Sequence, residues 1–154
     1  MPDINARLKE LGFHLPEVPS PAGNYVPATI AGGMLFISGQ LPMIAGKLQF
    51  TGKVGREYSI EQGRECARIC GLNILAQVNN VLGGDWCQIK HLARIGVFVN
   101  ALDDFTDHPQ VANGISDMMV NIFGDAGKHA RFAVGVSSLP FGAAVEIEAI
   151  FDLH

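Results

Sequence analysis

The chain reads Ala130-Arg131-Phe132-Ala133-Val134-Gly135-Val136 shortly before its end, and in this segment apolar residues alternate with Arg131, Ala133 and Gly135. Alternation with a period of two is typical of a β-strand that buries one face. Arg131 then points to the other face, where its neighbours on the strand are small. Small neighbours leave room beside a guanidinium, as a pocket for a small ligand requires. The segment therefore predicts a strand over residues 131–137 with Arg131 as a candidate binding residue.

A second alternating segment, Val145-Glu146-Ile147-Glu148-Ala149, follows the turn Leu139-Pro140-Phe141-Gly142. It predicts a strand over residues 144–152 whose two carboxylates share one face. If this strand paired with the preceding one, Arg131 and Glu146 could project into one space. On the pattern alone this pair has two interpretations. It is either a surface salt bridge, which contributes little to stability, or part of a ligand site.

The remaining elements follow from hydrophobic periodicity and turn residues. Strands are expected at residues 24–30, 34–38 and 89–99, with a short strand near 47–50 in the glycine-punctuated loop 41–55. Helices are expected from the capping box Ser59–Gln62 to Gly83, and from Thr106 or Asp107 to Gly124. The order is β-β-(β)-α-β-α-β-β, with two helices on one face of a mixed sheet. This is an α+β fold in one domain over residues 1–154, of which 1–22 form an N-terminal helix and a Pro-rich arm.

Composition limits the classes of function. Of the 154 residues 48% are hydrophobic and 17% are charged, so we expect a partner subunit to cover part of the apolar surface. A net charge of −4 without a cluster of Lys and Arg argues against nucleic-acid binding. Every hydrophobic segment is interrupted by Gly, Pro or charge, and the N-terminus lacks a signal-peptide layout. We therefore expect no membrane partner.

The cysteines and histidines give no metal or disulfide framework. Cys66, Cys70 and Cys87 are odd in number and are expected to be ordinary buried or half-buried thiols in a reducing cytoplasm. The five histidines are scattered without metal-ligand spacing, so no metal site is predicted. His129 lies two residues before Arg131 and could neighbour a site, but a solvated loop residue is the simpler interpretation. Ser38 lacks a nucleophile elbow and is expected to be a hydrogen-bonding residue at a strand end.

Several segments together resemble a known family. They are Ser38-Gly39-Gln40-Leu41-Pro42, Val97-Phe98-Val99-Asn100-Ala101-Leu102-Asp103-Asp104-Phe105, and the C-terminal segments 130–136, 139–140 and 145–149. In order and spacing they are similar to the Rid/YjgF family of reactive intermediate deaminases, also labelled endoribonuclease L-PSP. The resemblance runs from about residue 23 to residue 151. It implies a chorismate-mutase-like fold and a homotrimer with ligand clefts between adjacent subunits.

The resemblance also implies a reaction, the hydrolysis of small 2-imino or enamino acids to 2-oxo acids and ammonia, with no cofactor. The residues it assigns are Arg131 as carboxylate anchor and Glu146 as holder of the attacking water, with Tyr25, Ser38, Gly39, Asn113 and Ala133 lining the cleft. Gly135 stands where the family often has an acid, and the loop 124–129 departs from the usual approach to the arginine. Two alternatives remain. One is a homotrimer that binds small carboxylates without catalysis, and the other is an endoribonuclease, which the acidic composition disfavours.

Overall fold

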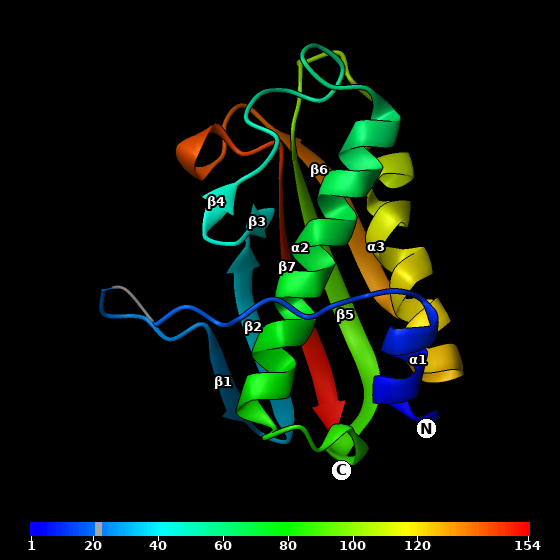
Figure 1. Ribbon diagram of the computed structural model, residues 1–154. Helices are drawn as coiled ribbons and strands as arrows, with labels where there is room; N and C mark the ends of the chain where they lie inside the picture. The colour runs from blue at the N-terminus through cyan, green and yellow to red at the C-terminus, as the bar shows by residue number, and fades with distance from the viewer. Residues whose placement is uncertain (21–22) are drawn as a thin grey trace.

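A five-stranded mixed sheet lies at the centre of the computed structural model, which describes residues 1–20 and 23–154 (Figure 1). Its strand order is β1-β2-β7-β5-β6. The bounds are β1 Ala28–Ala31, β2 Met34–Gln40, β7 Val145–Leu153, β5 Ile89–Asn100 and β6 Ala130–Val136. All neighbours are antiparallel except β5 and β6, which are parallel. A separate hairpin, β3 (Met43–Ile44) with β4 (Lys47–Leu48), occupies the loop after β2.

Two long helices cover one face of the sheet, as predicted (Figure 1). Helix α2 spans Ile60–Val81 and begins at the expected capping box, in which Ser59 and Gln62 bond each other's backbone N–H. Helix α3 spans His108–Phe123, but the predicted cap Asp107 makes no side-chain bond to the helix backbone. Its carboxylate instead accepts a hydrogen bond from the Gln110 amide.

The N-terminal segment packs onto this helical layer. Helix α1 (Ile4–Glu10) is capped by Asp3 as predicted, and Arg7 donates to the carbonyl of Asn121 at the end of α3. The following chain runs across α2 toward β1 in Figure 1, and Phe13 and Leu15 pack against the core. The predicted Pro-rich arm ends at residues 21–22, which lie outside the described residues.

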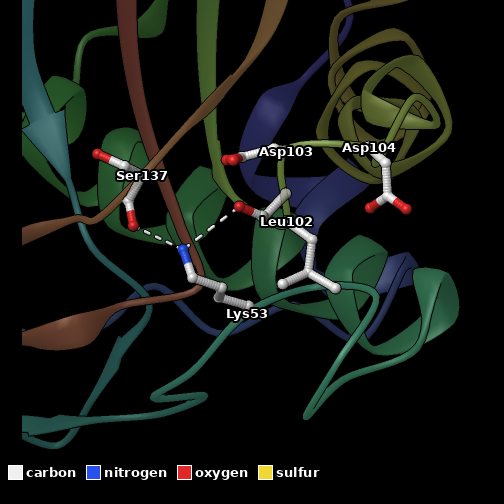
Figure 2. A pocket seen from close by; sticks show the side chains of 6 residues that line it. Lys53, Leu102, Asp103, Asp104 and Ser137 are labelled. Carbon is white, nitrogen blue, oxygen red and sulfur yellow. Dashed lines mark hydrogen bonds between the residues drawn. The ribbon is translucent and has the colours of Figure 1, made fainter.

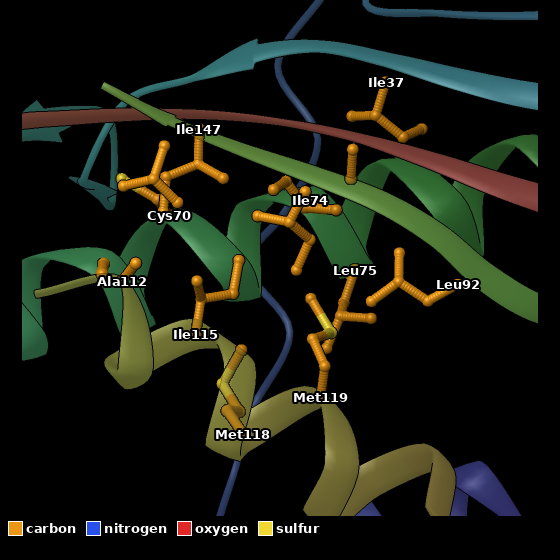
Figure 3. Close-up of a cluster of buried hydrophobic side chains, with 14 of the residues drawn as sticks. Ile37, Cys70, Ile74, Leu75, Leu92, Ala112, Ile115, Met118, Met119 and Ile147 are labelled. Atoms are coloured by element: carbon orange, nitrogen blue, oxygen red, sulfur yellow. The ribbon is translucent and has the colours of Figure 1, made fainter. Parts of the chain in front are cut away.

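The core fills the space between the sheet and the helices (Figure 3). Its fully buried members come from the centre of each element: Leu35, Ile37, Ile74, Leu75, Ile95, Val97, Val99, Ile115, Met119, Ile147 and Phe151. Strand β5 lies between two other strands, which confirms the central position predicted from its apolar residues. Cys66 and Cys70 are buried here as ordinary thiols, whereas Cys87 is exposed, against the prediction.

The arrangement of the last two strands decides the condition on which a direct Arg131–Glu146 pair depended. The last two strands in the chain, β6 and β7, are not neighbours, because β5 lies between them. Helix α3 connects β5 to β6 and makes these two strands parallel. Strand β7 then fills the position between β2 and β5, pairing antiparallel with both. Local alternation along each strand predicts faces correctly but carries no information on which strands are adjacent.

The other face of the sheet carries no helix in the part of the chain that the structure describes. Its apolar side chains come from four strands: Phe36, Phe98, Phe132, Val134 and Ile150. Phe36 is 39% exposed and Val134 is 42% exposed. We call this set the open face. The Arg94–Glu148 ion pair lies on the same face, next to Ile150. Exposed apolar side chains on an uncovered sheet face are typical of a site of protein association, in keeping with the subunit contact that the composition predicts.

We predict that substitution on the open face disrupts self-association without unfolding the chain. Val134→Lys should lower the mass measured by light scattering from three times the 16.5 kDa chain toward that of a monomer. A buried ammonium at an apolar interface is costly, whereas in the monomer the same side chain is in water. Val81→Lys, at the similarly exposed end of α2 (37%), is the matched control and should leave the mass unchanged. A wild-type monomer, or an unaltered Val134→Lys assembly, would contradict this prediction.

Candidate functional site

Arg131 lies on the edge strand β6, and its cross-strand partner on β5 is Ile95, which faces the helices. Its side chain therefore leaves the sheet on the helix-covered side, next to α3. The Nη1 group donates to Oδ1 of Asn113 at 2.8 Å and to Oγ of Ser116 at 3.1 Å. Asn113, assigned to the site by resemblance, is thus brought to Arg131. Ser116 was missed, although its place three residues further on a helix puts it on the same face as Asn113.

Arg131 differs from the other arginines in its partners. Each of the other five pairs with a carboxylate: Arg7 with Glu10, Arg56 with Glu57, Arg64 with Glu61 and Asp117, Arg68 with Glu65, and Arg94 with Glu148. Among the described residues, Arg131 has only the two neutral oxygens on Nη1. Its Nε–H and Nη2–H donors form the edge of the fork that binds a carboxylate through two parallel hydrogen bonds.

The residues that follow Arg131 on its face of β6 are small. Ala133 and Gly135 follow Arg131 on the same face, with Val97 and Val99 as their cross-strand partners. Above Gly135 lies the His108 ring, with Nε2 only 2.6 Å from the place that a Cβ on residue 135 would occupy. The absence of a side chain at residue 135 therefore gives the imidazole its place. We call Arg131, Asn113, Ser116 and Ala133 the arginine half-site. Further along β6, a cavity of about 310 Å³ is lined by Phe105, His108 and Gly135, among others.

His129 belongs to the hydrogen-bond network around Arg131 and is not the solvated loop residue that the sequence analysis favoured. Its Nδ1 is 2.6 Å from the carbonyl oxygen of Gly127, and its Nε2 is 2.9 Å from Oγ of Ser116. Burial, and secondarily the charge of Arg131, lower the pKa of His129 below its ordinary value, although the Gly127 carbonyl acts in the opposite direction. The lowered pKa favours the neutral form of the ring. Sequence analysis could not find the contact with Ser116, because that residue lies on a different element, α3.

Glu146 lies on β7 opposite Phe98 and points to the open face. Its carboxylate occupies the space next to Gly39, where a Cβ would overlap Oε1. A bulge in β2 makes this approach possible, since three residue steps from Ile37 to Gln40 match two steps on β7. Glu146 is half-buried and has no ion-pair or hydrogen-bond partner among the described residues. Burial raises the pKa of Glu146 above its ordinary value of 4.5.

The other two residues assigned by resemblance lie near this bulge. Ser38 precedes Gly39 in β2, and its backbone N–H donates to the carbonyl of Pro27 at 2.9 Å. Tyr25 lies two residues before Pro27 with its side chain 63% exposed, and it makes no side-chain hydrogen bond within the described chain. We call Glu146, Gly39, Ser38 and Tyr25 the carboxylate half-site, although the structure records no contact from Tyr25 to Glu146.

The two half-sites do not meet in one chain, because the strand pairing that would have brought Arg131 and Glu146 into one space is not present. Strand β5 separates β6 from β7, and the two residues align with Ile95 and Phe98, whose side chains leave opposite faces. Arg131 is on the helix-covered face, and Glu146 is on the open face. A salt bridge between them within one chain is therefore wrong as well. Within the described residues, Arg131 at the edge of the sheet and Glu146 on the open face therefore both lack an oppositely charged partner.

A second hollow, of about 400 Å³, lies at the ends of β5 and β6 (Figure 2). Lys53 borders it and donates to the Ser137 carbonyl at 2.6 Å, the Asn100 side chain at 2.7 Å and the Ala101 carbonyl at 3.3 Å. These three acceptors use all three N–H bonds of the ammonium. Lys53 therefore joins the loop after β4 to the two strand ends, and its charge is not available to a ligand.

Two further properties concern metals and membranes. Within residues 1–20 and 23–154, no three His, Cys, Asp or Glu side chains gather as a metal site would require. In the same residues no helix has the length and apolar character needed to span a bilayer.

Comparison with known proteins gives the family. Residues 5–151 match the family model described as "YjgF/chorismate_mutase-like, putative endoribonuclease". The chain is 41% identical to Protein TCP17 of Trypanosoma cruzi over 152 residues, which are 98% of this chain and 94% of the relative. A more distant relative from Dermatophagoides farinae, 28% identical over 136 residues (88% of this chain and 90% of the relative), is named 2-iminobutanoate/2-iminopropanoate deaminase.

Solved structures agree with this assignment. A protein of unknown function from Agrobacterium tumefaciens has a TM-score of 0.91 at 45% identity, covering 98% of this chain and 94% of its own. A "putative endoribonuclease" from Shewanella oneidensis has a TM-score of 0.93 at 33% identity, covering 97% of this chain and 99% of its own. Together with the family match they confirm the chorismate-mutase-like α+β fold. The chain belongs to the YjgF/RidA family.

Proposed function

We propose that the protein hydrolyses small 2-imino or enamino acids to 2-oxo acids and ammonia, in clefts shared by adjacent chains of a homotrimer. One observation carries the proposal: Arg131 alone among the arginines has no carboxylate partner in the described chain, yet neutral oxygens hold its guanidinium in place. A fixed arginine with a free edge is suited to a small organic acid. The named activity of the Dermatophagoides relative supports the same substrate class.

Assembly supplies the missing partner for each half-site. The arginine half-site lies at the edge of the sheet, and the carboxylate half-site lies on the open face. Association through the open face would cover its exposed Phe36 and Val134. The same association would bring the β6 edge of one chain over the Glu146 region of the next. Tyr25, Ser38 and Gly39 would then line the cleft from one chain, with Asn113 and Ala133 from the other.

The chemistry needs a held substrate and one proton carrier. Arg131 binds the substrate carboxylate and thereby sets the position of the neighbouring imine carbon. A water held by Glu146 attacks this carbon; the new C–O bond forms while Glu146 carries one water proton to the imine nitrogen. The product is a carbinolamine. Glu146 then carries the hydroxyl proton to the same nitrogen, the C–N bond breaks, and ammonia leaves a 2-oxo acid.

The backbone of β6 provides the remaining polar contact. Since β6 is an edge strand, one side of its backbone has no partner strand in the part of the chain that the structure describes. We propose that the carbonyl of Ala133 accepts the N–H of the imine and aligns the C=N bond with the water. This role uses the main chain, so a small residue at position 133 is compatible with it.

A carboxylate-binding homotrimer without catalysis uses the same Arg131 contact and is the second candidate. The neutral contacts that hold Arg131 support it, since binding of an anion needs no proton carrier such as Glu146. RNA cleavage, the activity in the family description, finds less support in a chain of net charge −4. Variants of Arg131 and Glu146 separate imine hydrolysis from carboxylate binding without catalysis.

We predict that Arg131→Met lowers both pyruvate binding and imine hydrolysis by at least about 100-fold, since a charge-assisted bidentate contact is lost. Arg131→Lys keeps the charge but not the planar fork, and should bind roughly tenfold more weakly than wild type. Arg68→Met, which removes a surface ion pair on α2, is the control and should have no effect. Calorimetry with pyruvate and an amino-acid-oxidase assay that traps the imine as semicarbazone give the two measurements. Normal binding by Arg131→Met would contradict the anchor role.

We predict that Glu146→Gln keeps pyruvate binding within a few-fold but lowers hydrolysis by about 10²–10⁴-fold, because the proton carrier is lost. The carboxylate is the active form, and burial raises its pKa above 4.5. The wild-type rate should therefore fall as the pH drops through this raised pKa, and this limb should be absent in Glu146→Gln. Glu61→Gln on α2 is the control. If wild type binds pyruvate but hydrolyses no imine, the binding trimer is the correct function.

A further inference from the structure

A chain of hydrogen bonds runs from the back of the arginine half-site into the fold. It begins at the Gly127 carbonyl, in the 3₁₀ turn η2 (Gly124–Gly127), and passes through His129 and Ser116 to Arg131. The three donor–acceptor distances are 2.6, 2.9 and 3.1 Å. Three different elements contribute, because Ser116 lies on α3 and Arg131 on β6. None of the roles described above requires His129.

The Gly127 carbonyl fixes the donor and acceptor direction of every hydrogen bond in this network. A carbonyl oxygen only accepts, so Nδ1 of His129 carries the proton and donates to Gly127. In a neutral imidazole the other nitrogen, Nε2, is then an acceptor, and the Ser116 hydroxyl donates to it. The lone pairs of Ser116 are left to receive the Nη1–H of Arg131. Gly127 is itself buried against the backbone of Met119, so the starting acceptor is fixed to α3.

We infer that His129 is a positioning residue for Arg131. Acting through Ser116, it keeps Nη1 turned toward α3 and thereby presents the Nε–H and Nη2–H edge to the ligand. The inference rests on the proposed function only for the nature of that ligand, a small carboxylate. Asn113 fixes the second Nη1–H, so the guanidinium plane is held at two points.

Neutral His129 is required for this role. A protonated ring would lose the acceptor on Nε2 and would place a second positive charge beside Arg131. Other charged groups around this network are already paired, since Asp125 bonds Lys128 at 2.7 Å in η2 and Asp117 on α3 faces Arg64 at 3.5 Å. None of these carboxylates is free to stabilise the imidazolium. The lowered pKa of His129 agrees with this environment.

The first test compares two substitutions at position 129. His129→Phe keeps a planar aromatic ring but removes both nitrogens, and it should weaken pyruvate binding by roughly tenfold. His129→Gln offers an amide acceptor near the position of Nε2, and it should recover most of the affinity. The affinity of wild type should fall as the pH drops through the pKa of His129, and this dependence should be absent in His129→Phe. His14→Phe, at an exposed histidine, is the control; equal binding by His129→Phe and wild type would overturn the inference.

A second measurement does not need a ligand. Nitrogen NMR of the histidine ring should show His129 as the Nδ1–H tautomer with Nε2 accepting a hydrogen bond. Arg131→Met removes the neighbouring positive charge and should raise the pKa of His129. An Nε2–H tautomer, or a pKa of His129 unaffected by Arg131→Met, would overturn the positioning role. Absence of pyruvate binding by wild type would instead count against the proposed function, and the tautomer and titration would still decide this inference.

Discussion

The position of β5 between β6 and β7 is the constraint on which the functional geometry depends. Side chains alternate along a strand, and cross-strand partners share a face of the sheet. Arg131 therefore lies on the same face as Ile95, and Glu146 lies on the same face as Phe98. A one-residue shift in either register would bring both charges to the same face. The observed register leaves a cation and a carboxylate unpaired on different surfaces of one chain. Such an arrangement leaves both groups available to a cleft shared with a second chain.

In the proposed site, the contacts that support Arg131 leave its charge available to a ligand. A neighbouring carboxylate would also hold a guanidinium in place, but it would compete with the carboxylate of a ligand. Glu148 occupies Arg94 in this way. Asn113 and Ser116 hold the guanidinium through neutral oxygens and leave its charge uncompensated. His129, as a neutral ring, in turn holds Ser116, one contact further from the ligand. The half-site is thus pre-organised by dipoles, which cost no reorganisation when the ligand arrives.

Much of the fold was predictable because its signals are local. The capping box at Ser59, the apolar stripe of α3 and the alternation in β6 each predict an element from residues close in sequence. The adjacency of β5 and β6 was not predictable in this way, since it depends on a parallel crossover through α3. Resemblance assigned Arg131, Asn113 and Glu146, and the structure shows that Asn113 contacts Arg131. Ser116 and His129 needed the three-dimensional contacts, because neither polar residue has a pattern that separates it from a solvated one.

The most direct test of a cleft shared by two chains is a mixture of two inactive variants. Differently tagged Arg131→Met and Glu146→Gln chains can be co-expressed, and trimers that carry both tags can be isolated and assayed for imine hydrolysis. In each mixed trimer one cleft combines an intact Arg131 from one chain with an intact Glu146 from its neighbour, so roughly one third of the wild-type rate should return. Mixed trimers that remain as inactive as their parents would contradict the account.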